Sequence, residues 1–203
     1  MPLYRSEIKG LERSPQREIY GIKNGYLVAP FDICIYEFNK PNYIANNALS
    51  LIHNADVNNV AGSIIGTIKS FDSPLNYNFI PVVFIELNQG VIVSSNVRKI
   101  EPSTVAKENE VSKGVTVHIT RNNGRVIKGG TILEKIIVKR SYILPNWEIE
   151  VYRVKFGQTL GNELHGAPVI LDNSHKLLGM LIITEDNHMN GTTECFVFPA
   201  DRL

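Results

Sequence analysis

The chain reads GNELHGAPVIL at residues 161–171 and KLLGMLI at residues 176–182. The first stretch is a tight turn of small and polar residues, followed by a proline and an apolar run typical of a buried strand. The polar segment 172–174 then favours a hairpin turn, and the second apolar run contains Gly179. We therefore expect two buried strands, at 167–171 and 177–184, with an exposed turn in front of them.

The rest of the chain also has the pattern of β-structure. Short runs rich in Val, Ile, Phe and Tyr alternate with turn residues such as Asn24-Gly25 and Asn190-Gly191. The further strands expected are 26–29, 33–38, 60–69, 79–87, 90–95, 115–120, 125–127, 131–138, 147–156 and 194–198. Helix is compatible with the sequence only near 3–13 and 45–54. Strands at this spacing predict a sandwich or closed barrels, not an α/β alternation.

One polar stretch without strand pattern, residues 101–113, divides the chain into two halves of similar size. We interpret it as a linker between two six-stranded antiparallel β-barrels. The expected organisation is an N-terminal arm at 1–20, a first barrel at 21–100 and a second barrel at 114–203.

Composition and charge exclude several classes of function. The chain has 203 residues, of which 43% are hydrophobic and 20% charged, and a net charge of +1, so it is long enough to bury substantial cores. Scattered basic residues give no support for nucleic-acid binding. The N-terminal residues lack the apolar region of a secretory signal, and no apolar run approaches a membrane span. We expect a soluble cytoplasmic protein.

The cysteines Cys34 and Cys195 lie in apolar, strand-like surroundings far apart in the sequence. One disulfide between them is possible on count alone, but two buried free thiols fit a cytoplasmic protein better. Neither cysteine has the surroundings of a catalytic nucleophile.

The stretch at 161–169 resembles the nucleophile turn of trypsin/chymotrypsin-like serine proteases, where the pattern is Gly-Asp-Ser-Gly-(Gly/Ala)-Pro-Val. The order of further segments is similar to that of a broad, divergent bacterial group of these proteins. These segments are YIANNAL at 43–49, IGTI at 65–68, PVVFIEL at 81–87, and GRV at 124–126 with GTI at 130–132. The resemblance covers roughly residues 22–200 and implies the trypsin-like fold of two six-stranded barrels.

The same resemblance implies that the catalytic residues are lost. The family serine falls on His165, the family histidine on Ala48 and the family aspartate near Pro81. In the nucleophile turn, Leu164 replaces an aspartate and Glu163 a glycine. A serine protease needs a nucleophile, a base, a carboxylate that orients the base and N–H donors for the oxyanion. We therefore expect a pseudoprotease that performs no ordinary proteolysis.

Such a protein would retain the cleft between the barrels as a binding surface for a protein or peptide partner, which in this fold pairs as an added strand. The candidate cleft residues are His53, Glu163, Leu164, His165 and Gly166. We expect no nucleic-acid or membrane partner, and the sequence leaves the oligomeric state open.

Two alternative functions remain open. The first is a hydrolase with a non-standard site, in which His165 acts itself or His53 is the base. His53 would then need a nucleophile, Ser50, Ser94 or Ser95, and a carboxylate, Asp56 or Asp72. The second is a structural module of a larger assembly, such as a phage or defence-system component.

Metal and cofactor sites have little support in the sequence. The five histidines form no i,i+4 pair and there is no Cys-x-x-Cys motif. A site of His53 and His165 with Asp56 or Glu163 would require these loops to meet across the cleft. Gly129-Gly130 has the pattern of a hairpin turn and lacks the Lys-Ser/Thr of a phosphate loop. We therefore expect no metal and no cofactor.

Overall fold

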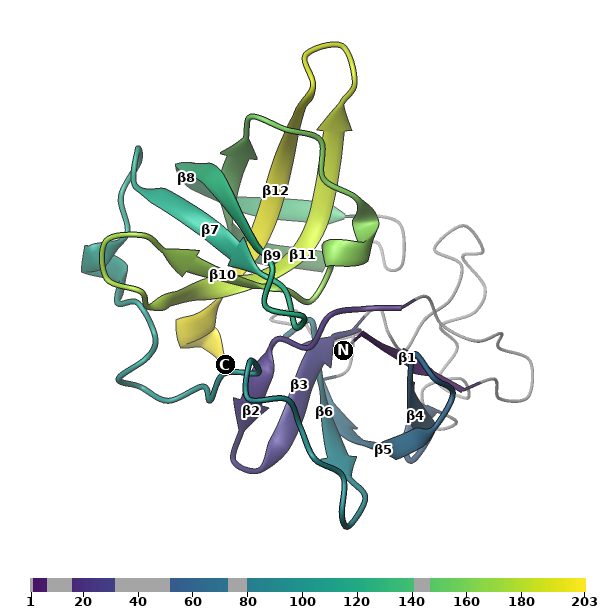
Figure 1. Cartoon of the computed structure of the whole chain (residues 1–203). Coiled ribbons are helices and arrows are strands. Elements are labelled where there is room, and N and C mark those ends of the chain that lie inside the picture. The colour runs from purple at the N-terminus through teal and green to yellow at the C-terminus, as the bar shows by residue number, and fades with distance from the viewer. Residues whose placement is uncertain (1, 7–15, 32–51, 73–79, 141–146) are drawn as a thin grey trace.

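The computed structural model describes residues 2–6, 16–31, 52–72, 80–140 and 147–203 (Figure 1). In this part of the chain the regular structure is almost entirely β, arranged as two antiparallel sheets of six strands each. No helix in the described ranges is long and apolar enough to cross a membrane.

The first sheet is a half-barrel built from the N-terminal part of the chain. Its strand order is β1-β4-β5-β6-β3-β2, and every neighbouring pair is antiparallel. A bridge between Leu3 and Arg17 joins β1 to the segment before β2 and bends the sheet round. The strands are β1 (Leu3–Arg5), β2 (Gly21–Lys23), β3 (Tyr26–Pro30), β4 (Asp56–Asn59), β5 (Ile64–Phe71) and β6 (Val82–Leu87).

The second sheet is a closed barrel with the order β10-β11-β12-β9-β8-β7. The predicted hairpin of 167–171 and 177–184 is confirmed as β10 and β11, which pair antiparallel. The barrel strands are β7 (Thr116–Thr120), β8 (Val126–Arg140), β9 (Trp147–Phe156), β10 (Pro168–Leu171), β11 (Leu177–Asn187) and β12 (Thr192–Pro199).

Strand β12 contributes to the cores of both sheets. Cys195 and Val197 are fully buried inside the closed barrel, whereas Phe196 and Phe198 belong to the core of the first sheet. Side chains of successive strand residues point to opposite faces, so one strand of the barrel fills two hydrophobic layers. The two sheets are therefore joined through a shared wall of apolar side chains and not only by the connecting chain.

Four details differ from the sequence-based expectations. Gly129 and Gly130 lie within the continuous strand β8, where a hairpin turn between two strands was predicted. Residues 3–5 form strand β1 where a helix was predicted, because pairing with β4 buries Leu3 completely. Residues 90–95 form turns and no strand: Val91 and Val93 pack on the first core, but Ile92 is 92% exposed. Strands β2 and β4 were missed because they are short and polar. The predicted strand at 33–38 lies outside the described residues, as does most of the predicted helix at 45–54.

The predicted linker, residues 101–113, lies along the second barrel. It contains the 3-10 helix η2 (Glu108–Glu110), and Val105 forms a bridge with Leu177 of β11. Salt bridges from Lys135 to Glu108 (2.8 Å) and from Lys176 to Glu110 (2.5 Å) tie η2 to the barrel. This segment is therefore held in place by backbone pairing and by charge.

Candidate functional site

The turn that precedes β10 is one turn of 3-10 helix, η3 (Asn162–Leu164), ending at His165. The N–H of His165 donates to the carbonyl of Asn162 (3.2 Å), and the N–H of Leu164 donates to that of Gly161 (3.2 Å). Leu164 is buried in the core of the second barrel and anchors the turn. Both N–H groups thus donate to carbonyls within the turn itself.

Gly166 fixes the turn against the first sheet. Its φ of 93° lies in the left-handed region that favours glycine. Its N–H donates to the carbonyl of Leu181 in β11 (2.8 Å). A Cβ at this position would overlap the carbonyl oxygen of Glu18 and lie 2.8 Å from Cδ of Pro30. The small residue in the quoted motif is therefore required by close approach of two backbone segments.

The imidazole of His165 lies half-buried beside β11. Its Nε2 is 3.4 Å from the hydroxyl of Thr184, which lies 2.7 Å from Oδ1 of Asn162. The single hydroxyl proton of Thr184 is donated to Asn162, so Nε2 of His165 is the donor in the other contact. Thr184 thus orients the ring at the position where the resemblance places a serine.

Glu163, next to His165, is exposed on η3. Its carboxylate folds back over Gly161, at the place that a Cβ of residue 161 would occupy. Among the proposed cleft residues, the structure therefore brings Glu163, Leu164, His165 and Gly166 together in one turn.

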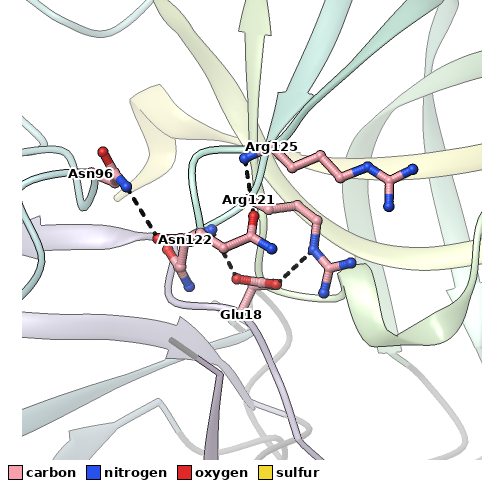
Figure 2. A network of polar contacts seen from close by, with 6 residues as sticks. Glu18, Asn96, Arg121, Asn122 and Arg125 are labelled. Atoms are coloured by element: carbon pink, nitrogen blue, oxygen red, sulfur yellow. Dashed lines mark hydrogen bonds and ion pairs between the residues drawn. The ribbon is translucent and has the colours of Figure 1, made fainter.

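A buried carboxylate, that of Glu18, holds the hairpin of β7 and β8 to the N-terminal segment (Figure 2). Glu18 is 2% exposed, and its carboxylate accepts hydrogen bonds from Nε of Arg121 (3.0 Å) and from the N–H of Asn122 (3.1 Å). The backbone N–H of Glu18 donates to the carbonyl of His165 (2.9 Å). Glu18 therefore connects the hairpin of β7 and β8 to the turn that carries His165.

No local signal in the sequence distinguishes Glu18 or Arg121 as part of this junction. Glu18 is an acid beside the buried pair Ile19 and Tyr20, and Arg121 is one of several scattered arginines. Their partnership joins residues more than 100 positions apart, so only the tertiary structure reveals it.

Of the two predicted triad positions in the first half of the chain, the structure describes only Pro81. Ala48 lies outside the described residues. Pro81 is buried directly before β6, and its carbonyl accepts a hydrogen bond from the N–H of Phe31 (2.8 Å). The carboxylate that follows on this strand, Glu86, forms a surface salt bridge with Lys69 (3.1 Å). Among the residues that the structure describes, the end of β3 reaches the nucleophile turn at Pro30.

The alternative catalytic residues are placed in turns. His53 is exposed in the turn before β4. The carboxylate of Asp72 accepts from the N–H of Ile80 (3.0 Å), and the hydroxyl of Ser94 accepts from the N–H of Asn96 (3.3 Å). Ser95 is exposed, and Ser50 lies outside the described residues. Asp72 and Ser94 thus have structural hydrogen bonds of their own.

A histidine–carboxylate pair lies on the closed barrel, outside the turn that carries His165. Nδ1 of His118 is 2.6 Å from Oδ1 of Asp172. Burial alone would raise the pKa of Asp172, but hydrogen bonds from His118 and Thr116 hold the pKa below its ordinary value. Within the described part of the chain, the hydroxyl of the nearby Ser174 has no hydrogen-bond partner. The pair therefore lacks a bonded nucleophile and acts as a structural contact.

No group of three His, Cys, Asp or Glu side chains among the described residues is placed to hold a metal ion. A pocket of about 390 Å³ lies elsewhere, where the connecting segment meets the end of the chain, and none of its lining residues belongs to the nucleophile turn. Its walls include Ile100, Val105 and Leu203.

Comparison with known proteins finds similarity at the level of structure alone. No family model matches the chain, and no curated protein sequence matches it.

Three solved structures share its architecture. A glutamic acid-specific serine protease, described as using a histidine triad in substrate binding, is 13% identical with a TM-score of 0.58, over 99% of this chain and 92% of that one. The Rv3671c protease in its inactive form is 13% identical with a TM-score of 0.56, over 98% and 82% of the two chains. The chymotrypsin of Cellulomonas bogoriensis is 15% identical with a TM-score of 0.53, over 91% and 84%. Together with the sheet topology, these similarities show that the chain has the trypsin-like fold.

Proposed function

We propose that this protein has the trypsin-like fold without peptidase activity and binds a protein or peptide beside the nucleophile turn. The observation that carries the proposal is the hydrogen bond from the N–H of His165 to the carbonyl of Asn162. Acyl transfer requires N–H donors aimed at the oxygen that becomes negative in the transition state. An N–H already donated within its own turn cannot do this without rearrangement of η3.

The side chains at the turn support the same proposal. The residue at the nucleophile position is an imidazole that donates through Nε2 to Thr184. The end of the first sheet contributes Pro30 to the turn, and Pro81 stands where the resemblance places the orienting aspartate. Nucleophilic catalysis needs a nucleophile within hydrogen-bond reach of a base. Pro81 supplies no carboxylate to orient a base, and Ala48, where the resemblance places the histidine, has no ionisable side chain.

Strand β11 supports the binding part of the proposal. Residues 183–187 pair with β12 along one edge, whereas β10 pairs only with residues 177–180 on the other. Beyond Leu181, whose N–H and carbonyl bond to Ala167 and Gly166, no strand in the described residues pairs with this second edge. Within the described residues this edge has no strand partner, and an edge of this kind accepts an extended peptide by backbone hydrogen bonds. Thr184, whose hydroxyl lies 3.4 Å from Nε2 of His165, belongs to this edge, so the edge runs beside His165.

The catalytic part is tested by incubating a diverse peptide mixture with the wild type and with His165→Ala, and reading the products by mass spectrometry. Chymotrypsin on the same mixture is the positive control. We expect no cleavage by either form of this protein over a day at micromolar concentration. Cleavage by the wild type that His165→Ala abolishes would overturn the proposal and establish the alternative, a hydrolase with a non-standard site at His165.

The binding part is tested by NMR, with the backbone amide signals of the intact protein followed as peptides are added. We expect shifts concentrated in residues 182–187 of β11 and in the turn at 161–166. Shifts confined to other strands, or no binding at millimolar peptide, would contradict a peptide site at this edge.

A further inference from the structure

We propose that Arg121 and Arg125, on the hairpin of β7 and β8, bind a carboxylate of the peptide partner. The inference rests on the proposed function and adds the chemistry of the ligand: a peptide with an acidic side chain close to the nucleophile turn. Three observations carry it: the opposition of the two arginines across the hairpin, the single carboxylate that compensates only Arg121, and the link from that carboxylate's residue to His165.

The two arginines occupy opposed positions. In the register of β7 and β8, Ile119 pairs with Ile127 and Thr120 with Val126. The next pair is Arg121 and Arg125, joined by a hydrogen bond from the N–H of Arg121 to the carbonyl of Arg125 (2.8 Å). Opposed residues of an antiparallel pair share one face, with Cβ atoms roughly 5 Å apart. Figure 2 shows both side chains extending on the same side of the hairpin.

Like charges in opposed positions repel each other unless an anion compensates them. Glu18 compensates one of the two, through the 3.0 Å contact with Nε of Arg121. The other oxygen of its carboxylate accepts from the N–H of Asn122. Within the described part of the chain, the exposed guanidinium of Arg125 has no ion-pair or hydrogen-bond partner. The site therefore retains one uncompensated positive charge.

Glu18 also fixes the position of the Arg121 guanidinium. Its carboxylate is buried and meets Arg121 at Nε, which leaves the terminal amino groups of that guanidinium outside the contact. The side chain of Arg121 is 19% exposed, so part of it faces solvent beside Arg125. An arginine already held by a buried partner loses little further freedom when it binds a ligand.

The pair lies close to the proposed peptide site. The backbone of Glu18 is bonded to the carbonyl of His165 and its carboxylate to Arg121. One residue therefore spans the distance between the nucleophile turn and the arginines. A peptide paired with β11 beside Thr184 needs only a neighbouring acidic residue to reach them.

The ligand chemistry follows from the guanidinium groups. Guanidinium donates two parallel hydrogen bonds to a carboxylate, which gives orientation as well as affinity. Two arginines in a chain of net charge +1 are too few for the extended phosphate contacts of a nucleic acid. We therefore assign the site to an acidic peptide residue.

The test uses the full chain and two matched sets of fluorescein-labelled octapeptides of Ala, Val and Ser. One set carries a single Glu at each position in turn, and the other carries Gln there. Binding is measured by fluorescence polarisation for the wild type, for Arg125→Gln and for Lys128→Gln. The last variant removes the same charge from an exposed residue of β8, three residues after Arg125. Arg125 is exposed, so its substitution leaves the fold intact, and thermal melting checks this.

We expect Glu at one register to bind roughly three- to tenfold more tightly than Gln. Arg125→Gln should abolish the preference, Lys128→Gln should retain it, and added salt should weaken it. Equal binding of the two sets, or a preference that survives Arg125→Gln, overturns this inference and leaves the proposed peptide site standing. Failure of both sets to bind at millimolar concentration overturns the proposed function as well. Arg125-dependent binding of a single-stranded oligonucleotide, without peptide binding, would overturn the assignment to a peptide.

Discussion

The backbone N–H of Glu18 donates a 2.9 Å hydrogen bond to the carbonyl of His165, and the carbonyl oxygen of Glu18 packs against Gly166. A segment from the beginning of the chain is thus part of the nucleophile turn. The position of that turn depends on the junction between the two sheets as well as on the barrel that contains it.

Removing the buried charge of Glu18 should weaken this junction. We expect Glu18→Gln to lower the free energy of unfolding by roughly 2–3 kcal/mol, because Arg121 loses its buried partner. Urea unfolding measures the change. The matched control is Glu86→Gln in the exposed pair with Lys69, whose side chains are 51% and 46% exposed, and which should cost about 0.5 kcal/mol or less. Equal losses in the two variants would contradict a special role for Glu18.

Adding a methyl group to Gly166 should be more damaging. We expect Gly166→Ala to destabilise the protein by about 2–4 kcal/mol, since the residue has a φ of 93° and the methyl would overlap Glu18. Gly157→Ala is the control, because a Cβ there meets nothing within 4 Å and should be neutral or slightly stabilising. Chemical denaturation compares the two, and a loss below about 1 kcal/mol for Gly166→Ala would show that the turn can move.

The contact between His118 and Asp172 should make stability depend on pH at the acidic end. The pKa of Asp172 is depressed in the folded state, so its contribution is fully present above the unfolded pKa of about 4 and is lost as the pH falls through the folded value. We expect the difference in unfolding free energy between wild type and Asp172→Asn to shrink from pH 6 to pH 3. Parallel curves for the two proteins over this range would contradict the prediction.

The thiol of Cys195 should be inert in the folded protein. Burial raises its pKa well above the ordinary value, and the thiolate is the reactive form. In a Cys34→Ser background, Ellman's reagent should modify Cys195 only after unfolding in guanidinium chloride. Ser63→Cys in the same background places a thiol in the exposed turn between β4 and β5 and should react within minutes. Rapid native labelling without Ser63→Cys would show that the barrel opens at β12.

Local patterns in the sequence were sufficient for the closed barrel. The apolar runs at 168–171 and 177–184, divided by a polar turn, predict β10 and β11 because strands buried in a barrel read as continuous hydrophobic segments. The resemblance around Gly166-Ala167-Pro168 then led to the correct fold. This motif is informative because the fold brings the backbone of Glu18 so close to Gly166 that no larger residue fits there. The same reasoning failed for residues 90–95, where apolar residues pack on a core without a strand partner.

The sequence by itself determined most strands of the second half, the β-rich class of the chain and the identity of the residue at the nucleophile position. It failed at Gly129-Gly130, which lie within β8 and form no turn between two strands. Only the tertiary structure decided which distant residues meet there: that Pro30 reaches Gly166, that Glu18 holds Arg121, and that the N–H of His165 bonds back to Asn162. The physical reason is the separation along the chain of the residues that interact. Hydrophobic periodicity is set by neighbours along the chain, whereas a buried ion pair between residues 18 and 121 depends on how two sheets dock, which no local pattern encodes.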